Sequence, residues 1–218
     1  MLFPSMNILG ICMTFLIRNT AILILVTGCS SFTVDSNLIN FINFFKFERS
    51  LLEENFSKIN SSFIAIEQGS NEAIFILTKI DNKEIYHWEG ANEQSIMTYK
   101  GLIIGTKGLD SNYEVIESSL ESMKSFPVES LSIRYNLTNP ELYGDFAEYS
   151  LLQKKRVNLN HYQEDIKATQ FIYKRRSAAI GWQSKDTYVF SDNGLPILTE
   201  QTLSPLQRSI RISFHYKY

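Results

Sequence analysis

The sequence predicts a mainly β protein: an antiparallel β-barrel or sandwich with a short N-terminal helical region, preceded by a signal peptide. From Phe63 onward, short β-branched and aromatic runs are separated by turn residues about every 8 to 12 positions. Asn193-Gly194 lies between two apolar runs, which is a strong hairpin signal. The first 28 residues carry a single charge, Arg18, and so differ in composition from the rest of the chain.

The N-terminal residues 1–28 have the layout of a secretory signal. Arg18 precedes the apolar run Ala21–Val26, which is far shorter than the roughly 20 residues that a spanning helix needs. The alternative is an uncleaved anchor helix from Ile8 to Val26, in which Arg18 would cost roughly 2.5–3.5 kcal/mol in the bilayer core. Translation from Met6 or Met13 in place of Met1 would shorten the signal.

Val26-Thr27-Gly28-Cys29 resembles a bacterial lipobox. The resemblance implies a lipoprotein signal peptide that is cleaved before Cys29, whose thiol then carries the lipid (diacylglycerol, with a further chain such as palmitate). Each buried methylene contributes about 0.8 kcal/mol, so such an anchor is stable without a spanning helix. We therefore divide the chain into a signal peptide (1–28), a tether (29–36) and a single β-rich domain (37–218). Ser30 after the cysteine implies transfer to the outer membrane.

The composition excludes several classes of protein. With 44% apolar and 20% charged residue types, the chain is globular and is neither disordered nor collagen-like. Acidic residues outnumber basic ones by 23 to 21, so no nucleic-acid partner is expected. Cys12 and Cys29 are the two cysteines, so the folded part has no disulfide framework and no cysteine zinc site.

The sequence lacks the common motifs of catalytic and cofactor sites. His87, His161 and His215 are far apart, and there is no P-loop, dinucleotide fingerprint or Gly-x-Ser-x-Gly elbow. We therefore expect no enzyme activity, no metal and no cofactor. The remaining catalytic alternative is a polysaccharide-modifying hydrolase with a long-range pair of carboxylates.

Elements are predicted in order along the mature chain. A helical lead covers Asn37–Phe47, where Leu38, Ile42 and Phe45 share one face, and a helical turn follows at Ser50. The predicted strands are then Phe63–Glu67, Ala73–Thr78, Glu84–Trp88, Ser95–Tyr99, Leu102–Thr106, Ser130–Leu137, Tyr149–Leu159, Lys167–Lys174, Thr187–Phe190, Leu195–Thr199 and Ile210–Tyr216.

Two tryptophans and one basic triplet are candidate contacts with a glycan or a partner protein. Trp88 and Trp182 can stack on a sugar ring, or they can pack at the mouth of a barrel. Lys154, Lys155 and Arg156 can contact an acidic polymer, or they can mark a solvated strand edge that resists further pairing.

Two segments resemble the YjbF family, the group 4 capsule lipoproteins, also called GfcB-like or YmcC-like. The first runs from the strand of Trp88 to Gly101, Thr106, Gly108 and Leu109, although Leu102 stands where the family often has Arg. The second is the closing hairpin with Gln201 and Pro205, where Thr199 replaces the usual Ser. We expect structural roles for these residues: Gly101 and Gly108 suit backbone with positive φ, and Thr106 can bond to neighbouring backbone.

The resemblance implies a lipoprotein anchored in the outer membrane of a Gram-negative cell and facing the periplasm. It implies a non-catalytic, accessory role in the production or export of capsule or exopolysaccharide. Implied partners are an outer-membrane β-barrel protein and a periplasmic protein of the same system. A second hypothesis is a glycan-binding module that holds the nascent polysaccharide.

Overall fold

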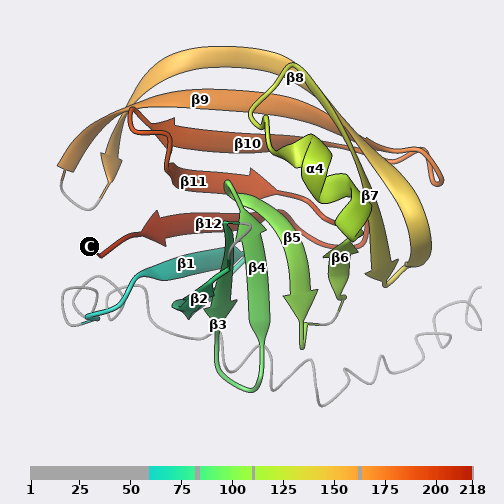
Figure 1. Cartoon of the computed structure of the whole chain (residues 1–218), viewed down its shortest axis with the longest axis horizontal. Coiled ribbons are helices and arrows are strands. Elements are labelled where there is room, and N and C mark those ends of the chain that lie inside the picture. The colour runs from blue at the N-terminus through green and yellow to red at the C-terminus, as the bar shows by residue number, and fades with distance from the viewer. Residues whose placement is uncertain (1–58, 82–83, 110, 162–163, 218) are drawn as a thin grey trace, which may run out of the picture. The chain divides into compact units, whose positions relative to one another are not determined.

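The computed structural model describes residues 59–217, apart from positions 82–83, 110 and 162–163. These residues form one closed antiparallel barrel of twelve strands, in which each strand pairs with its neighbours in sequence and β12 pairs with β1 (Figure 1). The predicted mainly β, antiparallel class is therefore confirmed, and of the two predicted architectures, barrel and sandwich, the structure has the barrel. The predicted signal peptide, tether and helical lead lie outside the described residues.

The strands differ greatly in length, from three residues in β6 to 21 in β8. Their bounds are β1 Phe63–Gln68, β2 Asn71–Ile80, β3 Ile85–Glu89, β4 Ser95–Tyr99, β5 Leu102–Lys107, β6 Tyr113–Val115, β7 Ser130–Thr138, β8 Glu141–His161, β9 Glu164–Ser177, β10 Gln183–Ser191, β11 Pro196–Gln201 and β12 Ile210–His215. A short 3-10 turn, η2 (Glu117–Ser119), and the single-turn helix α4 (Leu120–Met123) lie between β6 and β7.

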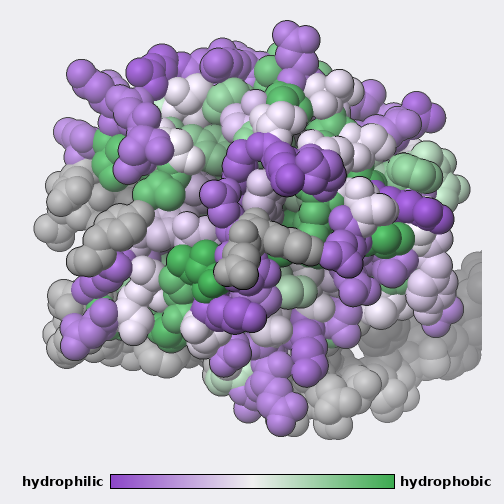
Figure 2. All heavy atoms as spheres, viewed as in Figure 1, coloured by the Kyte–Doolittle hydropathy of each residue, from purple (hydrophilic) through white to green (hydrophobic). Residues whose placement is uncertain are grey.

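Alternation of side chains places one face of each strand inside the barrel. In β7, Leu131, Ile133, Tyr135 and Leu137 are buried, and the serines and Arg134 between them are exposed. β-branched and aromatic residues suit this half-buried environment. Figure 2 shows polar side chains over much of one outer surface, with smaller apolar areas between them.

The interior of the barrel is filled with large side chains. Trp88, Tyr113, Tyr173 and Tyr188 each have no exposed surface. The Trp88 ring lies edge-on to Phe214, with 5.9 Å between the ring centres, an arrangement that aromatic pairs prefer. The barrel is thus a packed core and not a channel.

Because the strands run up and down in sequence order, successive loops alternate between the two ends of the barrel. One end, here called the mouth, holds the β1–β2, β5–β6, β7–β8 and β11–β12 connections. The opposite end holds the β4–β5 turn and the β6–β7 segment, and the β6–β7 segment closes this end. Its Phe126 is 2% exposed, and the centre of the Phe126 ring lies 5.0 Å from that of Tyr188 and 5.5 Å from that of Tyr173. Lys100 Nζ of the β4–β5 turn donates to the Lys124 carbonyl.

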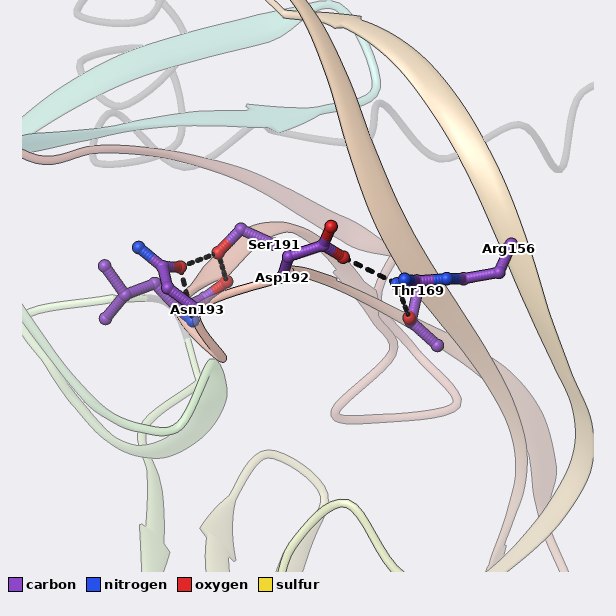
Figure 3. Close-up of polar contacts among 6 residues, drawn as sticks. Arg156, Thr169, Ser191, Asp192 and Asn193 are labelled. Atoms are coloured by element: carbon purple, nitrogen blue, oxygen red, sulfur yellow. Dashed lines mark hydrogen bonds and ion pairs between the residues drawn. The ribbon is translucent and has the colours of Figure 1, made fainter.

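The predicted Asn193-Gly194 hairpin joins β10 to β11, with Gly194 at a φ of 82°. Ser191 Oγ lies 3.0 Å from the Leu195 carbonyl oxygen, and the Leu195 N–H donates to Asn193 Oδ1 at 3.4 Å (Figure 3). No helix among the described residues is long and apolar enough to cross a membrane.

Candidate functional site

Gln201, a residue of the family resemblance, links the inner walls of the barrel. Its Nε2 donates to the Gly101 carbonyl at 2.8 Å, and its Oε1 accepts the N–H of Ile103 at 3.0 Å. The Tyr188 hydroxyl donates to the same Oε1 at 3.2 Å. One amide, 1% exposed, therefore holds the β4–β5 turn against β11.

Gly101 is needed where this turn meets β11. Its φ is 80°, and a Cβ added there would lie 2.9 Å from Cβ of Pro196 and 3.1 Å from Cγ2 of Thr199. A side chain would thus meet both a strained backbone conformation and an occupied space.

The other residues of the first matched segment lead into the mouth. Thr106 Oγ1 accepts the Tyr113 N–H at 2.8 Å, which joins β5 to β6. Gly108 has a φ of 72°, and the Leu109 N–H donates to Asn112 Oδ1 at 3.3 Å. The expected backbone roles of Thr106 and Gly108 are therefore observed.

One backbone carbonyl joins three loops at the mouth. The carbonyl of Asn139, in the β7–β8 turn, accepts from Ser111 Oγ at 2.9 Å and from Ser204 Oγ at 3.3 Å. Ser111 belongs to the β5–β6 loop and Ser204 to the β11–β12 loop, and both are buried. Pro205, next to Ser204, is exposed and forms the outside of the β11–β12 loop.

These loops enclose a cavity of about 190 Å³, here called the mouth cavity. Four of the lining residues are apolar, namely Leu109, Leu203, Leu206 and Ile210. The other four are polar, namely Gln68, Ser111, Asn139 and Gln207. Both segments of the family resemblance contribute to the lining, through Leu109 and Leu203, and none of these eight described residues is charged.

Two buried charges hold the wall of the mouth cavity that precedes Leu203. The Asp186 carboxylate accepts the Thr202 N–H at 3.2 Å, and Arg175 Nη1 donates to the Thr202 carbonyl. Arg175 and Asp186 both have no exposed surface. Together they bind the backbone N–H and the backbone carbonyl of Thr202, at the start of the β11–β12 loop.

Aromatic rings surround the Arg175 guanidinium. Its Cζ lies 5.3 Å from the ring centre of Tyr135, 5.5 Å from that of Tyr113 and 5.4 Å from that of Trp182. Cation–π attraction of this kind is strongest where water is excluded, so the rings stabilise a charge that has few oxygen acceptors.

Burial acts against the ionised forms of the acidic groups in this interior. Burial raises the pKa of Asp186 to about 6, even though Arg175 and the hydrogen bonds from Thr202 and Ser184 act to lower it. Burial also raises the pKa of Tyr113 to about 12. Asp145 differs: burial acts to raise its pKa, but hydrogen bonds from Ser177, Tyr135 and backbone outweigh it and lower the pKa.

The structure separates the predicted contact residues. Trp88 is fully buried and donates from Nε1 to Thr98 Oγ1 at 2.8 Å, so it offers no ring face to a sugar and is removed from the candidate contacts. Burial is favourable here because the hydroxyl of Thr98 satisfies the indole N–H. Trp182 is half-buried and lies against Arg175, so at least part of its ring is committed to packing.

The basic triplet lies elsewhere, on an overhang of β8. β7 pairs with β8 only as far as Ser150, so Lys154, Lys155 and Arg156 occupy a part that is paired with β9. All three are exposed, and Arg156 Nη1 is 2.6 Å from Asp192 Oδ1 and 2.9 Å from Thr169 Oγ1 (Figure 3). Lys154 Nζ lies 5.4 Å from the ring centre of Phe171.

Sequence reasoning missed the mouth cavity and the pair of buried charges. A signal for Asp186 was present, since it shares the period-2 face of Tyr188 and Phe190 within one strand. The cavity had no comparable signal, because its lining comes from four separate connections. The described residues contain no group of three or more His, Cys, Asp or Glu arranged to hold a metal ion.

Comparison with known proteins decides the family. A family model described as "Group 4 capsule polysaccharide lipoprotein gfcB, YjbF" matches residues 42–214. The chain belongs to the YjbF family. The resemblance in the matched segments is thereby confirmed, and the family's description associates its members with a capsule polysaccharide system.

A solved structure shows the same fold. The hypothetical lipoprotein YmcC from Escherichia coli K12 is similar, with a TM-score of 0.59 and 13% sequence identity, over 79% of this chain and 92% of that one. No curated protein matches the chain significantly. The two proteins thus share the barrel fold at low sequence identity.

Proposed function

We propose that this YjbF-family chain is a lipid-anchored, non-catalytic accessory factor in the production or export of capsule or exopolysaccharide. In this proposal Cys29 anchors it to the outer membrane, and the barrel faces the periplasm. The observation that carries the proposal is the family match, which extends across the barrel. The lipobox ending at Cys29 provides independent support for the anchor.

The proposed role is to dock a partner of the same polysaccharide system, such as an outer-membrane β-barrel protein or a periplasmic protein. A packed interior and a mouth cavity with neutral lining support binding in preference to hydrolysis. A glycoside hydrolase needs two carboxyl groups facing one cleft, and the eight described residues that line the mouth cavity include no carboxyl group.

The anchor is tested by Cys29→Ala. We expect the variant to leave the outer-membrane fraction and to appear in the soluble periplasmic fraction, because the lipid attachment point is lost. The measurement is immunoblotting of fractionated cells, with Cys12→Ala as the matched control, since Cys12 precedes the cleavage site and its loss should change nothing. A Cys29→Ala protein that stays in the outer membrane would show that the anchor is wrong.

The role in the polysaccharide system is tested in the same strains. Deletion of the coding sequence should reduce surface or secreted polysaccharide, and the wild-type chain should restore it. Unchanged polysaccharide output after deletion would overturn the proposed function, whatever the outcome of the fractionation.

A further inference from the structure

We propose that the mouth cavity binds one uncharged sugar residue of a polysaccharide, an inference that rests on the proposed role in a polysaccharide system. It assigns sugar contact to side chains other than the tryptophans and the basic triplet. The contacts would come from the amide side chains of Gln68, Asn139 and Gln207 and from the leucines of the lining.

The polar lining residues carry hydrogen-bonding groups for which the described part of the chain supplies no partner. Within the described part of the chain, the side-chain amides of Asn139 and Gln207 form no hydrogen bond. Gln68 Nε2 donates to the Arg208 carbonyl at 3.1 Å, which leaves its Oε1 as an acceptor. An amide offers both donors and acceptors, and a sugar hydroxyl needs both from its neighbours.

The apolar lining residues can contact the C–H groups of a sugar ring. Leu203 and Ile210 are buried, and Leu206 is 69% exposed. A ring that covers Leu206 would remove exposed apolar area from water, which is favourable.

Charge and size restrict the ligand. Since the eight lining residues that the structure describes are neutral, an ionised sugar would leave its hydration shell without gaining a counter-charge from them. The volume of about 190 Å³ is below the roughly 300–1,000 Å³ of typical ligand sites, so one ring of a polymer fits and a longer segment does not.

The cavity is also preorganised. The Asn139 carbonyl fastens the loops of Ser111 and Ser204, and the Arg175–Asp186 pair fixes Thr202 just before Leu203. Loops already held in place lose little conformational entropy on binding, which matters for a ligand with few contacts.

The test is saturation-transfer-difference NMR on the mature lipidated chain in detergent micelles. The probes are glucose, galactose, N-acetylglucosamine and, as the charged comparison, glucuronic acid. We expect transfer to at least one neutral sugar with millimolar affinity and weaker transfer to glucuronic acid at neutral pH.

Asn139→Ala and Gln207→Ala should each weaken the binding of that sugar about 3- to 10-fold, the usual effect of losing a neutral hydrogen bond. Gln153→Ala is the matched control, because it removes an exposed amide on the β8 overhang, away from the mouth. Leu206→Glu provides a second test at an exposed position, where folding is tolerant, and should abolish transfer by placing a charge in the lining. Thermal unfolding of each variant verifies that it is folded.

Absence of transfer to all three neutral sugars would overturn the inference, as would equal binding by wild type, Asn139→Ala, Gln207→Ala and Leu206→Glu. Stronger binding of glucuronic acid would also overturn it, because the neutral lining predicts the opposite order. If no sugar binds but deletion of the coding sequence still reduces polysaccharide output, the sugar site is wrong and the proposed function stands. If a neutral sugar binds but deletion leaves polysaccharide output unchanged, the sugar site stands and the proposed function is wrong.

Discussion

Arg175 and Asp186 place two charges inside a barrel whose other interior positions are mostly aromatic or aliphatic. Charged residues are rarely buried completely unless they are paired or hydrogen-bonded. Here the two side chains share one target, the peptide groups of Thr202, and the guanidinium is enclosed by rings. Their combined effect is to hold the β11–β12 loop at the mouth.

Asp186 makes folding stability depend on pH. Its pKa is raised from 3.8 to about 6 by burial, so the folded protein holds this proton more tightly than the unfolded chain does. The resulting stabilisation is fully present below about pH 4 and is lost as the pH rises through 6. At 1.36 kcal/mol per pKa unit, the loss can reach about 3 kcal/mol.

Asp186→Asn removes this contribution but keeps an oxygen that can accept the Thr202 N–H. Between pH 5 and pH 7.5, we expect the variant to gain about 1–2 kcal/mol in free energy of unfolding relative to wild type. Urea denaturation at the two pH values measures the change. Glu114→Gln, which alters an exposed carboxyl on β6, should follow wild type, and parallel behaviour of Asp186→Asn and wild type would contradict the prediction.

Individual residues show where sequence reasoning stops. Gly101 and Gly108 could be assigned positive φ from their turn positions, and the structure gives 80° and 72°. The burial of Trp88 was open between two interpretations, because the inward or outward direction of a strand residue depends on which face the barrel encloses. Gln201 has no local feature that predicts its bonds to residues about a hundred positions earlier.

The β4–β5 hairpin is stabilised by its contacts with β11. Gly101→Ala should destabilise the protein by more than Gly194→Ala, although both glycines have a φ near 80°. Gly194 has nothing within 4 Å of an added Cβ, so its substitution costs only the backbone strain, about 1 kcal/mol. At Gly101 the contacts with Pro196 and Thr199 add to that strain.

Chemical denaturation of both glycine variants measures the difference, and we expect at least about 1 kcal/mol more loss for Gly101→Ala. Equal losses would show that the β4–β5 turn moves away from β11 without penalty.

The β6–β7 segment closes the end of the barrel opposite the mouth, and Phe126 is its main contact. Phe126→Ala should reduce the free energy of unfolding by about 3–5 kcal/mol, because it leaves a cavity among Tyr173, Tyr188 and Phe190. Phe146→Ala is the matched control: its ring is 48% exposed, so the loss should be much smaller. Similar thermal midpoints for the two variants would contradict the assigned role of Phe126.

Predictability of the elements followed their length and pattern. Ser95–Tyr99 was predicted with the observed bounds, since turn residues flank a clear apolar run. β8 begins eight residues before the predicted Tyr149, at Glu141, because Gly144 and the charged residues around it resemble a loop. The three-residue β6 was missed, since so short a strand depends on pairing with β5 and β7 and not on its own composition.

Closure of the barrel determines which surfaces this chain presents. Pairing of β1 with β12, from Phe63 opposite His215 to Glu67 opposite Arg211, leaves neither terminal strand as an edge. The basic triplet lies on the part of β8 that pairs with β9 but extends beyond the pairing with β7, and its three side chains are exposed. The two segments that identify the family meet at the mouth cavity only because closure brings their loops together.

Local pattern was sufficient for the strand-rich class, most strands, the Asn193-Gly194 hairpin and the family, because turn chemistry, side-chain alternation and short motifs depend on neighbouring residues. Lipid attachment at Cys29 stays a prediction of the same local kind. Tertiary structure alone decided three features: the burial of Trp88, the hydrogen bonds of Arg175 and Asp186 to Thr202, and the mouth cavity. Each of these requires contacts between residues far apart in the chain, and such contacts arise only when the strands are paired in register around a closed barrel.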